Sequence, residues 1–353
     1  MWLQTGYFEL QTCGNNGSIS KVFDAIMADK LSSRLLYLVM KNQHGFVQNK
    51  SIVTNLINYS HYIAESLNEG NQVHLIYLDF AKAFDSVNHE LFILKLFNLG
   101  LKGGTLKWIS SYLASREQSV RIKGNFSDPF IANCGVPQGS HLGPLLFIIF
   151  INDISDVIST CEYQVYADDI KIYLEIGSIA NQLDLQRDLD EIYRWSLRNF
   201  LRLNVSKCKA LTFCRTLRKM QYNYTLNSVS LETDSNFKDL CIIFESNFEF
   251  KLNVETIAAK AFSLYGFIIR STKEFRKNEP VIAIYRSLIL SKFLFGSIIW
   301  SPYRQVNIHN LESVQHKFLR YVSFKIGDPM LFTNYNYNTI ASTLNLPSNK
   351  IST

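Results

Sequence analysis

The stretch Val165-Tyr166-Ala167-Asp168-Asp169-Ile170-Lys171-Ile172 decides the fold of this chain. Apolar residues alternate on both sides of the two aspartates: Tyr163, Val165 and Ala167 precede them, and Ile170, Ile172 and Leu174 follow them. A period of two is typical of half-buried strands. The stretch therefore predicts a β-hairpin with two adjacent carboxylates at its tip.

Carboxylates at such a tip favour a cation site. Two adjacent ionised carboxylates repel each other, so a hairpin that keeps both usually presents them to a cation. A third, Asp79, directly follows the apolar run from Val73 to Leu78. If the two strands lie side by side, Asp79, Asp168 and Asp169 converge as ligands for two Mg²⁺ ions in phosphoryl transfer. An isolated Asp-Asp pair is more often a plain turn, but an unpaired carboxylate ending a buried strand is costly.

Length and composition describe a globular chain. It has 353 residues, 47% of them hydrophobic and 19% charged, which predicts two or three domains and excludes a disordered chain. The net charge is +6, and residues 251–353 alone contain 13 Lys and Arg against 5 Asp and Glu. This basic region favours a polyanionic partner, although a solvated basic face is an equal alternative.

The spacing of the cysteines and the lengths of the apolar runs indicate the cellular compartment of the protein. None of the six cysteines has C-x-x-C spacing, so we expect reduced, buried thiols rather than zinc ligands or disulfides. No basic residue precedes Lys21, and the run from Leu145 to Ile151 is too short to span a membrane. We expect a soluble, intracellular protein without a signal peptide.

The order of the expected elements predicts an α+β fold rather than a doubly wound sheet. Apolar periodicity and capping residues predict helices over 19–40, 52–67 (capped by Ser51), 88–99, 105–114, 140–152 (capped by Ser140) and 183–203. Strands are expected over 73–80, 118–122, 129–134, 210–214 and 240–244. The chain reads as helical from residue 254 on, with Pro280 beginning one helix.

Residues after Asp79 suit nucleotidyl transfer, in which metal ions activate a 3′-hydroxyl and neutralise a triphosphate. The backbone carbonyl of Phe80 is a candidate extra ligand. Phe84 is placed to exclude a 2′-hydroxyl from a sugar site, although core packing is the commoner role of a phenylalanine. Asp85 is expected to cap the helix that follows.

Further candidates lie downstream. In the turn before residue 143, the backbone of Gly139 allows close approach of a nucleotide and Gln138 can bind a sugar or phosphate oxygen, but an ordinary loop is the alternative. Lys207 is a candidate acid for the pyrophosphate, the alternative being a solvated surface lysine. Tyr166 would buttress a primer or simply pack.

Five segments together resemble the palm motifs of reverse transcriptases from non-LTR (LINE-type) retrotransposons, especially the insect jockey-like group. They are residues 78–87, 135–147, 166–169, 203–208 and 238–244. Gln43-His44-Gly45-Phe46 with Ser51 resembles the family's fingers segment, and residues 296–303 and 314–320 resemble its thumb and C-terminal region. The resemblance covers the chain from about Ile19 to beyond Tyr321.

The resemblance implies a right-hand polymerase, with partial fingers at 1–72, a palm at 73–248 with a finger-like insertion at about 105–134, and a helical thumb region at 249–353. It implies DNA synthesis from deoxynucleoside triphosphates on an RNA template and DNA primer, with two Mg²⁺ ions (Mn²⁺ as the alternative), in the nucleus or a cytoplasmic ribonucleoprotein and away from membranes. The implied roles are metal ligands for Asp79, Asp168 and Asp169, sugar gate for Phe84 and nucleotide contact for Gln138.

The chain also departs from the family. Val47 replaces an arginine, Cys241 replaces a glycine, and Leu294-Phe295 replaces a Glu-Tyr pair. Residues 1–17 do not resemble the family's finger strands, and no endonuclease domain precedes them. We therefore expect a truncated copy, and the alternative function is a catalytically defective remnant that binds nucleic acid without polymerising.

Overall fold

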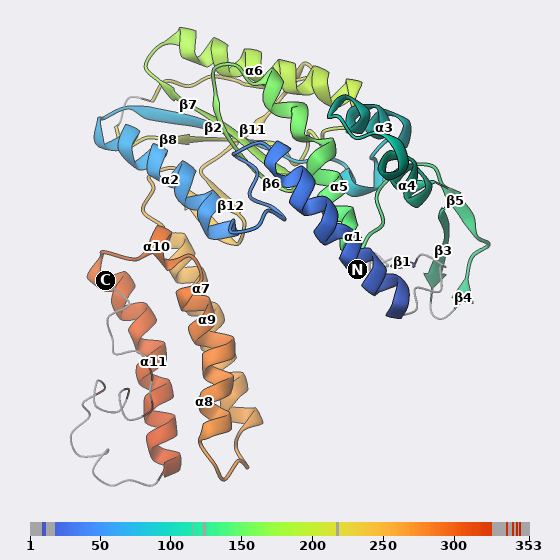
Figure 1. The fold of residues 1–353 in the computed structure, drawn as a ribbon. Coiled ribbons are helices and arrows are strands. Elements are labelled where there is room, and N and C mark those ends of the chain that lie inside the picture. The colour runs from blue at the N-terminus through green and yellow to red at the C-terminus, as the bar shows by residue number, and fades with distance from the viewer. Residues whose placement is uncertain are drawn as a thin grey trace. The chain divides into compact units, whose positions relative to one another are not determined.

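The computed structural model describes residues 9–11, 18–114, 116–122, 125–216 and 219–326, with residues 337, 341, 344 and 346. The backbone divides into two compact units, residues 1–234 and 235–353, which are described separately (Figure 1). Helices and strands mix in uneven order, which confirms the predicted α+β class. The division does not test the predicted boundaries of fingers, palm and thumb, which stay a prediction.

The first unit is built on a sheet of five strands in the order β11-β8-β2-β7-β6. The strands are β11 (Glu232–Asp234), β8 (Lys209–Phe213), β2 (Gln72–Leu78), β7 (Asp169–Ile176) and β6 (Glu162–Tyr166). Neighbours are antiparallel except for the parallel pair β11 and β8. Every residue of β2 is buried, as expected of a strand covered on both faces. The strand expected over 73–80 is thus present as Gln72–Leu78, and Asp79 directly follows it.

Helices cover both faces of this sheet, with α2 (Ile52–Asn68) and α6 (Ile179–Arg198) on opposite sides (Figure 1). Alternate residues of paired strands share a face. One face of β7 carries Tyr173, whose ring lies 5.1 Å from that of Tyr62 on α2. The other carries Ile170 and Ile172, which join the core with α6 and α5 (Leu142–Phe150). This core holds the strand ends in place.

Local hydrogen bonds mark some of the helix starts. Ser51 caps α2 in a reciprocal box with Thr54, and the Ser140 hydroxyl accepts the N–H of Gly143 at 2.8 Å at the start of α5. The other helical elements of this unit are α1 (Ser18–Leu35), η1 (Leu36–Leu38), η2 (Ala83–Asp85), α3 (His89–Asn98), α4 (Gly103–Leu113) and η3 (Asn152–Val157).

Two helix predictions are wrong in detail. The helix expected over 183–203 begins at Ile179, after a capping box at Ser178, and ends at Arg198, because Phe200 takes a left-handed φ of 57°. Asp85 does not cap α3. That cap is Asn88, whose Oδ1 accepts the N–H of Leu91 at 2.9 Å.

A second, smaller sheet contains β1 (Glu9–Gln11), β3 (Arg116–Ile122), β4 (Asn125–Phe126) and β5 (Phe130–Ala132). The pairing of β3 with β5 confirms the strands expected over 118–122 and 129–134. The pairing of β1 with β3 was not expected, since residues 1–17 show no strand pattern. A separate pair joins β9 (Thr225–Leu226) to β10 (Val229–Ser230).

The second unit begins with the hairpin β12 (Asn236–Asp239) and β13 (Ile242–Glu245). It continues with α7 (Lys251–Ser271), α8 (Glu279–Tyr285), the π-helical turn η4 (Arg286–Leu290), α9 (Ser291–Leu294), α10 (Ser297–Trp300) and α11 (Gln305–Ile326). Within the described residues the C-terminal part is helical as predicted, and Pro280 lies in the first turn of α8. α7 is long and apolar enough to cross a membrane, a test that core helices also pass, and it packs against α11 and α8.

The cysteine expectation holds only in part. Cys161, Cys208 and Cys214 are buried free thiols, whereas Cys134 and Cys241 are exposed; Cys13 lies outside the described residues. Cys241 and Leu240 form the turn between β12 and β13 with φ of 78° and 41°. Residues other than glycine are strained at such φ values, and the strand expected over 240–244 begins only at Ile242.

Candidate active site

Two of the three predicted carboxylates meet at one end of the central strands. Asp79 follows Leu78, the last residue of β2 paired with β7, and Leu78 lies opposite Ile170. Asp168 lies in the two-residue turn that joins Tyr166 to Asp169. Burial and the nearby Asp79 raise the pKa of the Asp168 carboxyl, an effect that Lys207 opposes. The strand register places Asp79 and Asp168 at the same end of the neighbouring strands β2 and β7, in agreement with the direction of this pKa shift.

Asp169 lies differently. Its side chain is exposed at the start of β7. Within the described ranges, no three His, Cys, Asp or Glu side chains gather closely enough to hold one metal ion. The structure thus brings together Asp79 and Asp168, and the role of Asp169 as a third ligand stays a prediction.

The paired carboxylates fit a divalent cation. Oδ2 of Asp79 is buried without a hydrogen bond, and its ion pair with the Lys207 ammonium at 3.3 Å lacks hydrogen-bond geometry. Mg²⁺ prefers hard oxygen ligands and keeps water in its remaining coordination positions. A buried carboxylate oxygen without a hydrogen-bond donor is costly, and a bound cation would remove that cost. Asp79 and Asp168 would hold such an ion.

The segment after α6 fixes Asp79 and Lys207 relative to each other. The N–H of Asn204 donates to the Asp79 carbonyl at 2.8 Å, and the N–H of Ala81 donates to the Arg202 carbonyl at 2.8 Å. A turn follows, in which the N–H of Lys207 donates to the Asn204 carbonyl at 3.0 Å. These hydrogen bonds hold the segment so that the exposed side chain of Lys207 lies beside Asp79.

The phenylalanines beyond Asp79 have separate surroundings. The Phe80 ring is buried 6.3 Å from Trp195, so its contribution to metal binding is limited to the predicted backbone carbonyl. The half-buried Phe84 ring stacks on Phe147 of α5 with centroids 4.2 Å apart. Phe46, which is exposed, approaches Phe84 edge-on at 6.5 Å. Packing thus orients Phe84 without burying it fully, and its role as a sugar gate stays a prediction.

The predicted glycine turn is tied to the same segment. The N–H of Gly135 donates to the Val87 carbonyl at 2.7 Å, and that of Val136 donates to the Phe84 carbonyl at 2.8 Å. Gly135 has a φ of 82°, and a Cβ there would lie 2.8 Å from the Asp85 carbonyl oxygen. Glycine is needed here for internal packing.

Gln138 and Gly139 lie at the exposed tip of that turn. The Gln138 amide donates to Oδ1 of Asp85 at 2.7 Å, which gives Asp85 a role other than the predicted cap. Gly139 has a φ of 78° with open space around its would-be Cβ. Tyr166 is half-buried at the end of β6. The contacts predicted for these three residues with nucleotide or primer stay predictions.

Sequence reasoning missed two residues. The Arg116 guanidinium donates to the carbonyls of Cys134 and Gly135, which holds the glycine turn. Gln43 binds the backbone of Ala167, beside Asp168. Hydrogen bonds between segments so far apart in the sequence produce no local periodicity. For Gln43, the one clue was its place in the fingers-like segment, two residues before Gly45.

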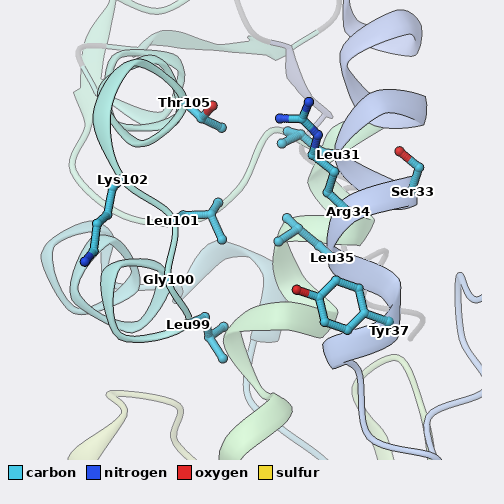
Figure 2. A pocket seen from close by; sticks show the side chains of 10 residues that line it. All are labelled: Leu31, Ser33, Arg34, Leu35, Tyr37, Leu99, Gly100, Leu101, Lys102 and Thr105. Atoms are coloured by element: carbon cyan, nitrogen blue, oxygen red, sulfur yellow. The ribbon is translucent and has the colours of Figure 1, made fainter.

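A separate cavity of about 610 Å³ lies between α1, η1 and the loop that joins α3 to α4 (Figure 2). Its lining includes Arg34, Tyr37 and Leu101 and none of the carboxylates. The predicted carboxylates therefore lie at the strand ends and not in this cavity.

Known proteins resemble this chain over most of its length. The family profile described as "Reverse transcriptase (RNA-dependent DNA polymerase)" matches residues 14–271. A probable RNA-directed DNA polymerase from transposon BS of Drosophila melanogaster is 25% identical across 95% of this chain and 39% of its own length. The RNA-directed DNA polymerase from mobile element jockey of Drosophila funebris is 24% identical across 87% of this chain and 34% of its own length. The chain thus spans less than half the length of these curated relatives.

Among solved structures, telomerase from Candida albicans in complex with a fragment of telomeric RNA is similar, with a TM-score of 0.39, 15% identity, and coverage of 93% of this chain and 53% of that one. A TM-score below 0.5 does not establish a shared fold, so the assignment rests on the sequence match. The mixed helices and sheets are consistent with the right-hand polymerase fold predicted above. The chain belongs to the reverse transcriptase (RNA-dependent DNA polymerase) family.

Proposed function

We propose that this chain carries the catalytic centre of an RNA-directed DNA polymerase of a non-LTR retrotransposon. It would transfer a nucleotide from a deoxynucleoside triphosphate to the 3′-hydroxyl of a DNA primer on an RNA template. The observation that carries the proposal is the meeting of Asp79 and Asp168 at the ends of β2 and the β6–β7 hairpin. These elements belong to one sheet, which keeps the two carboxylates in register.

The chemistry follows from charge placement. Two Mg²⁺ ions, or Mn²⁺ in their place, supply activation of the 3′-hydroxyl and neutralisation of the triphosphate. Asp79 and Asp168 would hold the ions, with Asp169 and the Phe80 carbonyl as further ligands. Lys207, 3.3 Å from Asp79, is placed to protonate the departing pyrophosphate.

The nucleotide would lie beside Phe84 and the exposed tip of the glycine turn. Phe84, braced by Phe147, excludes a 2′-hydroxyl by its bulk. Asp85 orients the amide of Gln138 toward the nucleotide's sugar or phosphate. Gly139 leaves the backbone open to close approach. Tyr166 would support the primer end next to the aspartates.

The partners of this reaction are an RNA template, a DNA primer and deoxynucleoside triphosphates, and the proposed location is the nucleus or a cytoplasmic ribonucleoprotein. The alternative, a remnant that binds nucleic acid without polymerising, is not better supported. The basic region of residues 251–353 suits both functions, whereas the paired carboxylates serve only the polymerase.

Primer extension tests the proposal. Purified chain is given an RNA template with an annealed DNA primer, Mg²⁺ and the four deoxynucleotides, beside the Asp79→Asn variant. Extension that disappears in the variant and in chelator supports the polymerase. Salt-dependent binding of the hybrid without extension would support the remnant instead.

A further inference from the structure

The turn that carries Asp168 has an unfavourable backbone. Ala167, the first of its two residues, has a φ of 56°. In this left-handed region the Cβ of any residue other than glycine crowds the backbone, so neighbouring contacts must maintain the conformation. Asp168 is the next residue, and a change at Ala167 would move its carboxylate relative to Asp79.

The amide of Gln43 supplies such contacts. Its Oε1 accepts the N–H of Ala167 at 2.9 Å and that of Gly45 at 2.8 Å, and its Nε2 donates to the Ala167 carbonyl at 3.3 Å. One side chain thus binds both the donor and the acceptor of Ala167. Gln43 is fully buried, so water does not compete for these bonds.

The backbone around Gln43 is itself held against β6. The N–H of Val165 donates to the Asn42 carbonyl at 3.0 Å, and the N–H of His44 donates to the Val165 carbonyl at 2.8 Å. The Lys50 ammonium donates to the Gln43 carbonyl at 2.9 Å. The segment therefore runs parallel to β6 as an added edge that ends at the turn.

The backbone of Gly45 also packs closely against the backbone of Ala167. A Cβ on Gly45 would lie 2.4 Å from the Ala167 nitrogen, closer than a real contact allows. The segment thus reaches the Ala167 backbone twice, through the Gln43 amide and through the bare backbone of Gly45. Both contacts fall on the residue beside Asp168.

We propose that Gln43 is a positioning residue, which holds Ala167 in its left-handed conformation and so sets the affinity of the Asp79–Asp168 pair for a divalent cation. This inference rests on the proposed function. Loss of a residue that orients a metal ligand typically weakens metal binding or activity by about ten- to a hundred-fold. Gln43 would belong to that class although it contacts no ion.

The test compares Gln43→Met with Asn55→Leu. Methionine has a similar volume but makes none of the amide's bonds. Asn55 is a matched control. Its buried amide donates to the carbonyl of Val165 in β6, the strand before the turn, at 3.0 Å, but does not reach the turn itself. Val165 keeps the His44 bond when Asn55 is lost. Mn²⁺ affinity is measured by the loss of the free-ion electron paramagnetic resonance signal, and single-turnover primer extension is followed in parallel.

We expect Gln43→Met to weaken Mn²⁺ binding about tenfold or more, with Asn55→Leu remaining at the wild-type value. Adding Ala167→Gly to Gln43→Met should restore part of the affinity, because glycine adopts positive φ without support. A purely structural role for Gln43 would not give this rescue. If Gln43→Met does not fold, Gln43→Asn, which keeps the amide on a shorter arm, takes its place.

Equal Mn²⁺ affinity in the Gln43 and Asn55 variants would overturn the inference while leaving the proposed function intact. Absence of rescue by Ala167→Gly would overturn the route through Ala167. A wild-type chain that neither binds Mn²⁺ nor extends a primer would instead remove the proposed function, and this inference with it.

Discussion

The ammonium of Lys207 lies 3.3 Å from Oδ2 of Asp79, so a lysine occupies the charge environment in which a metal ion is expected. We predict that Lys207→Met lets Mg²⁺ bind more tightly, because a competing cation is gone, while the rate of nucleotide incorporation falls by about 10² to 10⁴ for loss of an acid. Single-turnover extension across a range of Mg²⁺ concentrations measures both effects.

Lys207→Arg separates charge from proton transfer, because arginine keeps the positive charge and does not release a proton at neutral pH. It should therefore be slow while requiring as much Mg²⁺ as the wild type. A full rate in Lys207→Arg would show that the lysine contributes charge alone.

Asp168→Asn should stabilise the metal-free protein while inactivating it. Burial and Asp79 raise the pKa of the Asp168 carboxyl, so its ionised form opposes folding at neutral pH. Removing a ligand should also slow incorporation by about 10³-fold or more, given the several kcal/mol that metal ions contribute. Thermal unfolding with and without Mg²⁺ tests this: the ion should stabilise the wild type and leave Asp168→Asn unchanged.

Asp188→Asn is the matched contrast. Although burial opposes it, hydrogen bonds from the backbone of Cys161 and Thr160 and from Ser159 hold the pKa of Asp188 below its usual range. This carboxylate supports folding, and its loss should cost about 1–3 kcal/mol. If both variants shift stability in the same direction, the assignment of Asp168 as a repelled ligand is wrong.

Phe84→Val should admit ribonucleotides. The smaller side chain leaves room for a 2′-hydroxyl, so incorporation of ribo- relative to deoxynucleotides should rise about tenfold or more. The control is Phe92→Leu, which changes a fully buried ring 5.6 Å from Phe150 and should cost about 1 kcal/mol of stability. Competition between the two nucleotide types in primer extension is the measurement, and unchanged sugar selection in Phe84→Val would refute the gate.

His74 makes the first unit sensitive to acid. Burial lowers its pKa to about 4, and the ring bonds Tyr224 and the Met220 carbonyl. The unfolded chain, with a histidine pKa of about 6.5, binds the proton more readily, so stability falls as the pH drops from about 6.5 to about 4, by up to about 3 kcal/mol. Urea unfolding at pH 7 and 4.5 should show this loss, reduced in His74→Gln. The same loss of stability in the wild type and in His74→Gln would show that His74 is not its source.

Local pattern predicted the strands that carry the aspartates. Alternation before Ala167 and after Asp169, and the unbroken apolar run before Asp79, each report burial directly. The pairing of β2 with β7 was only a condition of the predicted metal site, and the structure supplies it. The turn at Leu240 and Cys241 was not predicted, because the apolar run there indicated a strand over 240–244.

Ties between distant segments were not predictable in this way. The bond from Gln138 to Asp85 and that from Gln43 to Ala167 join residues with no shared periodicity. The end of α6 was missed because the apolar spacing continues to Leu203 after the left-handed Phe200 has already ended the helix. Each of these three features depends on tertiary contacts or on backbone conformation, which the hydrophobic pattern does not report.

Asp79 and Asp168 would share at least one of the two divalent ions. Mn²⁺ titration of the wild type, Asp79→Asn, Asp168→Asn and the double variant tests it most directly. Groups that act on a common ion are not additive, so each single substitution should abolish the tight site and the double variant should lose nothing further. Single variants that keep wild-type affinity, or losses that add independently, would contradict the account.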